Sequence, residues 1–109
     1  MADRSTDVIQ GTLDMLILKA LSLEPMHGFG VARRIEQVTS EVFRVNPGSL
    51  LVAFRRLERD DLVAAEWRVS ENSRRARYYR LTEPGRRRLK EETRDWDRRV
   101  AAIAKLMEA

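Results

Sequence analysis

Apolar residues recur at helical spacing in two short segments near the start of this 109-residue chain. The segment "GTLDMLILKALSLEP" has the i, i+3, i+4 pattern of an amphipathic helix that ends at Pro25. In "MHGFGVARRIEQVTS", the spacing of Val31, Ile35 and Val38 predicts a second short helix after a glycine-containing turn. The apolar stripe of the first helix consists of Leu13, Leu16, Ile17, Ala20 and Leu21.

A third helix is predicted in "NPGSLLVAFRRLERDDLV", after a Pro-Gly break and with either Asn46 or Ser49 as its cap. On a helical wheel one side is apolar and is expected to face the core. This side consists of Leu50, Ala53, Phe54 and Leu57. The opposite side consists of Gly48, Val52, Arg55 and Arg59, with Leu51 and Arg56 at its flanks. The outer face is therefore basic but interrupted by small and aliphatic side chains.

Two segments that follow alternate with a period of two, which predicts a hairpin of half-buried strands. In "VAAEWRV" one face carries Val63, Ala65, Trp67 and Val69. We expect Trp67 to lie in the core. In "ARYYRL", Tyr79 and Leu81 share a face. The polar segment between the strands places the hairpin tip at Asn72 to Arg75.

The final segment predicts one long helix, with Thr82 as its cap and Pro84 in its first turn. It contains a heptad-like seam in which Thr93 is the one weak member. The seam consists of Leu89, Thr93, Trp96, Val100, Ile103 and Met107. A helix of ~25 residues is ~37 Å long, which exceeds what this small core can cover. The part of this helix that the core cannot cover is expected to pack against a partner, most simply a second copy of the chain.

Positive charge is concentrated in the middle of the chain. The formal net charge is +4, but residues 42–88 contain 12 Arg and 6 acids. This region includes the third helix and the hairpin, so its field can attract a polyanion.

Other function classes find little support in the composition. The chain has no Cys and one His, and it lacks a phosphate-binding glycine-rich loop, so we expect neither an enzyme nor a metal site nor a cofactor. The apolar run Met15 to Leu18, like every other in the chain, is too short to span a bilayer, and the first residues lack the apolar stretch of a signal peptide. We therefore expect a cytoplasmic protein with no membrane partner.

Three short helices, an arginine-bearing hairpin and a long helix are the order of a winged helix-turn-helix, a mainly α fold with a small β-hairpin. In that architecture the third helix lies in the major groove of double-stranded DNA, and the hairpin tip reaches the backbone or minor groove. The guanidinium group of arginine can donate two hydrogen bonds to guanine or to phosphate, and neighbouring aliphatic side chains can contact thymine methyl groups.

The chain also resembles the PadR family of bacterial transcriptional regulators, in its small subfamily with a single C-terminal helix. The resemblance covers Gly11 to about Trp96 and rests on "GTLDMLILKAL", "MHGFG", "NPGSL" followed by "RLE", "SENSRRARYYRLTEPGRRRL", and a tryptophan in the last helix. It implies a winged helix-turn-helix over residues 1–82 and a dimerisation helix over residues 83–109. It further implies a repressor at an inverted-repeat operator, in some members released by phenolic acids or flat aromatic drugs.

From the pattern and the resemblance we expect two sets of site residues. The DNA-binding set is Ser49, Leu51, Val52, Arg55, Arg56, Arg59, Arg74, Arg75 and Arg77. The dimer-interface set is Leu89, Trp96, Val100, Ile103 and Met107. In family members that bind planar compounds, a tryptophan in the last helix lines a pocket between subunits, so the resemblance permits a small aromatic effector at Trp96.

One departure from the family pattern lies on the third helix. Where the family usually reads Gly-Ser-Leu-Tyr-Pro-Ala-Leu, this chain reads "GSLLVAF". Leu51 replaces a tyrosine associated with a phosphate contact, so that contact does not carry over. The exposed aliphatic pair Leu51 and Val52 motivates an alternative hypothesis, a degenerate winged helix kept as a protein-interaction module. Arg55, Arg59 and the basic hairpin favour the DNA-binding hypothesis.

Overall fold

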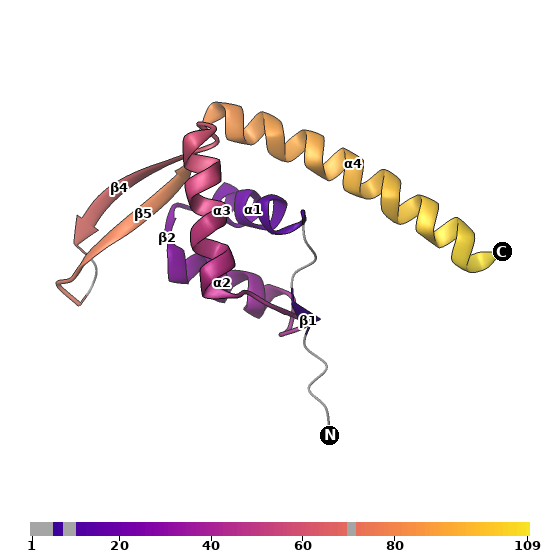
Figure 1. Cartoon of the computed structure of the whole chain (residues 1–109), viewed down its shortest axis with the longest axis horizontal. Helices are drawn as coiled ribbons and strands as arrows, with labels where there is room; N and C mark the ends of the chain where they lie inside the picture. Colours follow the sequence, from indigo (N-terminus) through magenta and orange to yellow (C-terminus); the bar gives the residue numbers. More distant parts are fainter. Residues whose placement is uncertain (1–5, 8–10, 70–71) are drawn as a thin grey trace, which may run out of the picture.

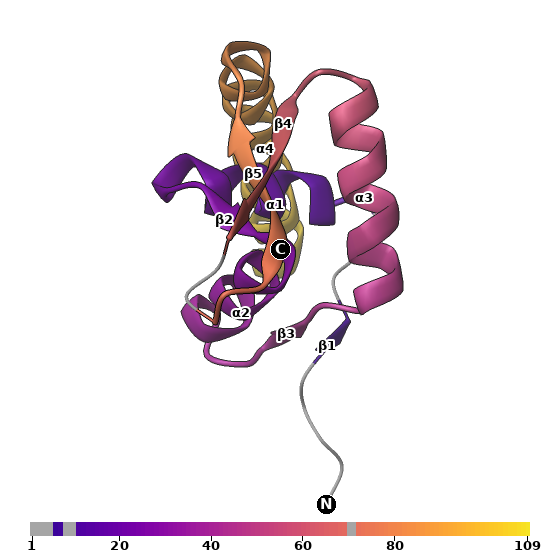
Figure 2. The same ribbon diagram turned by 90° about the vertical axis from the view of Figure 1, so that its left-hand side faces the viewer.

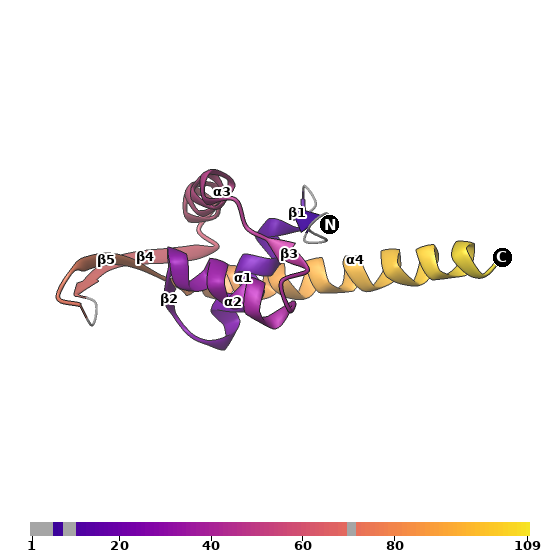
Figure 3. The same cartoon turned by 90° about the horizontal axis from the view of Figure 1, so that it is seen from below.

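The computed structural model of the chain describes residues 6–7, 11–69 and 72–109. Its helices are α1 (Leu13–Leu23), α2 (Gly28–Val38), α3 (Pro47–Arg59) and α4 (Glu83–Glu108). Its strands are β1 (Thr6–Asp7), β2 (Met26–His27), β3 (Phe43–Arg44), β4 (Val63–Val69) and β5 (Arg75–Leu81). The helices α1, α2 and α3 pack together, while the β4–β5 hairpin and α4 extend from them in opposite directions (Figures 1 and 3).

The first two helices bury most of their predicted apolar stripes. In α1, Ile17, Ala20 and Leu21 are buried, together with Leu18, and the remaining stripe residues are partly buried. In α2 the predicted stripe is confirmed at its first two positions. The predicted helix extends to Val38, which is exposed because it is the last residue of α2, where the helix leaves the core.

Helix α3 has the orientation that its pattern predicts. All four residues of its apolar side, Leu50, Ala53, Phe54 and Leu57, are buried. Of the two candidate caps, Asn46 is the one used: its side-chain oxygen accepts a hydrogen bond from the backbone N–H of Ser49 at 3.1 Å. The helix therefore begins where the Pro-Gly break places it, with its polar side facing away from the core.

The hairpin is confirmed and is part of a larger sheet than the sequence predicts. Strands β4 and β5 pair antiparallel, and β2 adds to the other edge of β5 through Met26 opposite Tyr79 and His27 opposite Tyr78. Strand β2 and the short parallel pair of β1 with β3 were not predicted from the sequence. Strands of two residues have no measurable periodicity, so the hydrophobic pattern cannot indicate them.

The prediction that Trp67 lies in the core is wrong, because the side chain is 58% exposed. Burial along β4 ends early: Val63 is buried, Ala65 packs against the core, and Val69 is exposed like Trp67. Alternation assigns residues to a face of the strand, but burial requires another element over that face. The outer half of the hairpin extends beyond the helices and lacks such a cover (Figure 1).

Helix α4 is anchored only at its beginning. The Thr82 hydroxyl accepts a hydrogen bond from the backbone N–H of Gly85 at 3.0 Å and donates one to the carbonyl oxygen of Asp61 at 2.7 Å. The first half of α4 contacts α1, and Leu89 packs against the core. The second half extends beyond the other elements (Figure 1).

Candidate nucleic-acid interface

The outward side of α3 presents a mixed apolar and basic surface. Ser49, Leu51, Val52, Arg55 and Arg59 are all exposed. Leu51 is 49% exposed and Val52 is 57% exposed, so neither aliphatic contributes to the core. Because Asn46 caps the helix, the Ser49 hydroxyl is not needed for capping. The hairpin lies beside α3 when the molecule is viewed from the hairpin end (Figure 2).

Two arginines on this side keep their guanidinium groups accessible. Arg55 is exposed and makes no ion pair with a residue in the described part of the chain. Among the described residues Arg59 forms an ion pair only with the neighbouring Asp60, with Nε and Oδ1 3.3 Å apart, and its side chain remains 72% exposed. An exposed ion pair of this kind contributes little and exchanges readily for another anion.

Arg56 is placed differently from the other predicted DNA-binding arginines. Its guanidinium forms a two-pronged contact with the carboxylate of Asp14 on α1, with Nε 3.1 Å from Oδ2 and Nη2 bonded to Oδ1. The hydrogen bonds that Arg56 donates to Asp14 raise the pKa of Arg56 above its ordinary value. Arg56 therefore links α3 to α1 and is not brought together with Arg55 and Arg59.

The hairpin arginines are arranged around one aromatic ring. The guanidinium carbons of Arg75 and Arg77 lie 5.1 and 5.9 Å from the ring centroid of Trp67. Arg77 also forms an ion pair with Glu58 of α3, while Arg74 lies exposed near the tip. Trp67 and Glu58 were not predicted as site residues. The period-two pattern assigns Trp67 to a face of its strand, but only the hairpin register places it opposite Arg77, so the sequence pattern gave no signal for this pair.

The base of the hairpin is held to α3 by stacked rings. Phe54 and Tyr79 stack with centroids 4.0 Å apart and an interplanar angle of 16°. Burial raises the pKa of the Tyr79 hydroxyl above its ordinary value of 10.0. This contact and the Glu58–Arg77 ion pair fix the angle between the hairpin and α3 at two points.

A groove of about 500 Å³ separates α3 from the hairpin. Its exposed apolar residues are Phe29, Leu51 and Trp67, and Arg75 and Arg77 also line it. Phe29 follows the turn into α2 and is the most exposed of the three. The groove thus places aromatic and aliphatic surface next to two cations.

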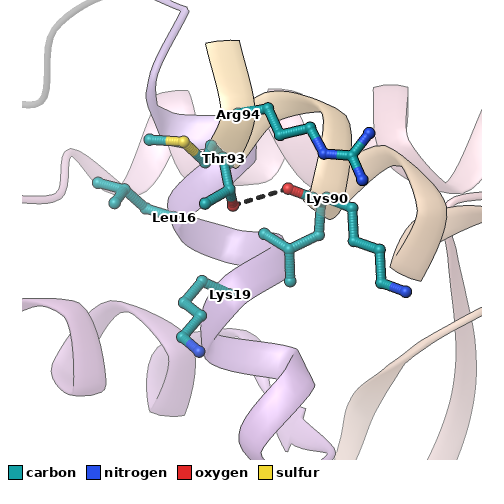
Figure 4. A pocket seen from close by; sticks show the side chains of 7 residues that line it. Leu16, Lys19, Lys90, Thr93 and Arg94 are labelled. Carbon is teal, nitrogen blue, oxygen red and sulfur yellow. Dashed lines mark hydrogen bonds between the residues drawn. The ribbon is translucent and has the colours of Figure 1, made fainter. Parts of the chain in front are cut away.

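The predicted dimer seam on α4 is uncovered over most of its length. Leu89 is partly buried, but Trp96, Val100, Ile103 and Met107 are exposed, with Ile103 at 61%. Thr93 donates its hydroxyl to the carbonyl oxygen of Leu89 at 2.8 Å, so this polar member of the seam is satisfied within its own helix (Figure 4).

A second groove, of about 550 Å³, lies between α1 and α4. In Figure 4, Leu16 and Lys19 extend from α1, and Lys90, Thr93 and Arg94 extend from α4. Trp96 is not among the residues that line this groove. The pocket that the resemblance permits at Trp96 would lie between two subunits.

The described residues contain neither a candidate metal-ligand cluster nor a candidate membrane-spanning helix. Among residues 6–7, 11–69 and 72–109, no three His, Cys, Asp or Glu side chains gather in an arrangement that could hold a metal ion. Within the same described residues, every helix is too short or too polar to cross a membrane.

Comparison with known proteins identifies relatives of the whole fold. Residues 17–91 match the profile of the "Transcriptional regulator PadR-like family". A transcriptional regulator from Clostridium thermocellum is 28% identical, with a TM-score of 0.81 over 89% of this chain and 94% of the other. A PadR family transcriptional regulator from Eggerthella lenta is 32% identical, with a TM-score of 0.76 over 92% of this chain and 85% of the other.

A sequence relative is also known in Lysinibacillus sphaericus, where "Uncharacterized protein X" is 28% identical over 91 residues, 84% of each chain. Together the similarities confirm the predicted fold, a mainly helical winged helix-turn-helix with a small antiparallel hairpin and a long C-terminal helix.

Proposed function

This chain belongs to the PadR-like family of transcriptional regulators, and we propose that it acts as a homodimeric repressor at an inverted-repeat operator. Membership of the family implies DNA binding and places the chain among non-enzymatic regulators. The observation that carries the proposal is the outward side of α3, where Arg55 and Arg59 stand clear of the core beside an arginine-bearing hairpin.

The proposed contacts follow from the chemistry of each exposed side chain. Arg55 and Arg59 donate to base edges or phosphates in the major groove, and Ser49 donates to a phosphate. Leu51 and Val52 have no polar atom in their side chains, so the groups they fit in the major groove are thymine methyls. The hairpin arginines Arg74, Arg75 and Arg77 contact the backbone. Arg56 holds α3 against α1 through its hydrogen bonds to Asp14.

The proposed dimer forms through the seam of α4. Its exposed apolar residues would be covered by the same residues of a second chain, as in a two-stranded coiled coil. A two-fold axis there would present two copies of α3 to one side of a duplex. The half-sites of the operator are then expected about one helical turn apart, ~34–36 Å.

Selection of bound sequences from random duplex DNA by the purified protein tests this proposal. We expect an enriched palindrome with half-sites spaced by one turn. Absence of enrichment would contradict sequence-specific repression and favour the alternative, an interaction module that uses Leu51 and Val52 to bind a partner protein.

A charge-reversal pair checks which surface binds. Arg55→Glu with Arg59→Glu should abolish binding to the enriched duplex without unfolding the chain, because both side chains are exposed. The matched control is Arg98→Glu with Lys105→Glu, which changes the same charge on the side of α4 opposite the seam. The control should retain the affinity of the wild type, and an equal loss in both variants would indicate a non-specific charge effect.

Release by a small aromatic effector is also proposed, at Trp96 where two copies of α4 meet. Trp96 is 37% exposed in the single chain, so its ring keeps surface for a planar compound between subunits. Titration of the protein–DNA complex with a phenolic acid and with a planar aromatic dye should release the DNA. Release from the Trp96→Phe variant at the same concentrations would show that the compound acts elsewhere.

A further inference from the structure

The exposed ring of Trp67 has no role in the core of this protein. Strand β4 leaves the core after Ala65. Among the described residues, the Trp67 ring makes cation–π contacts with the guanidinium groups of Arg75 and Arg77 and no other ring contact. A large aromatic side chain on the surface, next to the DNA-facing helix, calls for another explanation.

The pairing register of the hairpin brings Trp67, Arg75 and Arg77 together. Trp67 lies directly opposite Arg77, and Arg75 lies two residues before Arg77 on the same face of β5. Both guanidinium groups therefore reach the ring face, at the distances expected for cation–π contacts.

The two arginines differ in what else they contact. Arg77 is paired with Glu58, so its charge is partly neutralised and its side chain is tied to α3. Arg75 has no carboxylate partner among the described residues and keeps its charge. The ring thus supports one cation that is anchored to α3 and a second that is available to an anion at the groove between α3 and the hairpin.

We propose that Trp67 is a positioning residue for DNA binding, which holds the Arg75 guanidinium against its ring so that the hairpin presents a fixed cation to the phosphate backbone. A free arginine loses side-chain entropy when a phosphate immobilises it. Stacking on Trp67 orders the side chain beforehand and reduces that loss. The inference rests on the proposed function, since it assigns a part of the same interface.

The test uses the full chain and a fluorescein-labelled duplex that the wild type enriches, with affinity measured by fluorescence anisotropy over a range of salt concentrations. Trp67→Leu should weaken binding about five- to tenfold, and Trp67→Phe, which keeps an aromatic face, should recover most of it. Trp67→Leu should also reduce the salt slope by about one for each subunit, because one phosphate contact is lost.

A double-mutant cycle separates positioning from a general structural effect. Arg75→Gln should weaken binding about as much as Trp67→Leu, and the double variant should be little worse than either single variant. The matched control is Val69→Ala, an exposed apolar residue of β4 that lies directly opposite Arg75 but has no ring. It should bind like the wild type.

Two outcomes would overturn the inference while leaving the proposed function intact. One is that Trp67→Leu binds with wild-type affinity and salt slope; the other is that the losses in the double variant multiply. If Trp67→Leu does not fold, Arg75→Lys replaces it: this variant keeps the charge but stacks poorly, so wild-type affinity would reject the stacking role. If the wild type binds no duplex at all, the proposed function fails, and this inference fails with it.

Discussion

Gly85 lies where α4 passes over the end of the turn that follows α3. A Cβ at this position would be 2.0 Å from the carbonyl oxygen of Leu62, which is backbone and cannot move aside. We expect Gly85→Ala to lower the free energy of unfolding by about 2–4 kcal/mol, because either α4 or the turn must shift. Urea unfolding followed by circular dichroism measures the change.

A second glycine provides the control for this substitution. At Gly28, the first residue of α2, the nearest atom to a Cβ would be Cε2 of Phe54 at 3.6 Å, an ordinary contact. Gly28→Ala should change stability by no more than about 1 kcal/mol. If Gly85→Ala is equally mild, the close approach of α4 to Leu62 is wrong.

Ionisation of the Tyr79 hydroxyl is expected to lower the free energy of unfolding at alkaline pH. Burial raises the pKa of its hydroxyl above 10.0, so the folded protein holds this proton more tightly than the unfolded chain. The stabilising contribution is complete below pH 10 and disappears as the pH rises through the higher folded pKa. Tyr79→Phe should therefore lose less stability than the wild type between pH 9 and the alkaline limit of folding, as measured by thermal unfolding.

The neighbouring tyrosine serves as the comparison. Tyr78 is half-buried and points to the other face of β5, where Arg68 lies over its ring. Tyr78→Phe removes a hydroxyl from that other face of the same strand, so its stability curve provides the reference for the Tyr79→Phe curve. If the stability of Tyr79→Phe depends on pH in the same way as that of the wild type, ionisation of Tyr79 does not contribute to the loss of stability.

At the scale of elements, α4 has more apolar surface than its own chain covers. Ile103 is at the centre of the uncovered half and belongs to the predicted seam. Ile103→Glu should convert the proposed dimer to a monomer, because the like charges would face each other across the seam. Sedimentation or light scattering gives the mass, and affinity for a two-half-site duplex should fall by about a hundredfold.

The control lies two residues further along the same helix. Lys105→Glu reverses a charge on the side opposite the seam and should leave both mass and affinity unchanged. A wild-type protein that is already monomeric at micromolar concentration would reject the dimer proposal directly.

At the scale of the whole molecule, the uneven charge of the sequence becomes an uneven surface. The positively charged middle of the chain forms α3, the hairpin and the start of α4; α3 and the hairpin lie together, while the rest of α4 extends in the opposite direction (Figure 3). In the minimum case, only Arg55, Arg59 and Arg75 of both subunits neutralise phosphates and the salt slope is about −5; each further contact by Arg74 or Arg77 makes it steeper by about one. Affinity should then fall by about three orders of magnitude between 50 and 200 mM salt.

Anisotropy titrations at several salt concentrations measure this slope. Arg55→Glu with Arg59→Glu should flatten it, whereas Arg98→Glu with Lys105→Glu should not. A wild-type slope near zero would contradict a binding mode dominated by phosphate contacts.

The sequence by itself determined the helices, the hairpin, their order and the core side of α3. These follow from local spacing: Leu50, Ala53, Phe54 and Leu57 recur at a helical period, and a helix with such a stripe buries it. Arg55 and Arg59 then had to lie on the outer side. The local pattern does not show how far burial extends along the hairpin, and for this reason the prediction that Trp67 lies in the core was wrong. It also does not reveal the two-residue strands β1, β2 and β3.

Tertiary structure alone decided how the arginines are used. The partners of Arg56 and Arg77 are Asp14 and Glu58, 42 and 19 residues away in the chain. Arg77 meets Trp67 because the hairpin register places the two residues opposite each other, and Arg75 reaches the same ring from two residues earlier on the same face of β5. Hydrophobic periodicity records which face of an element is buried, but contacts between side chains on different elements depend on packing and register. The sequence therefore located the basic surface, and the fold decided which of its charges remain available to DNA.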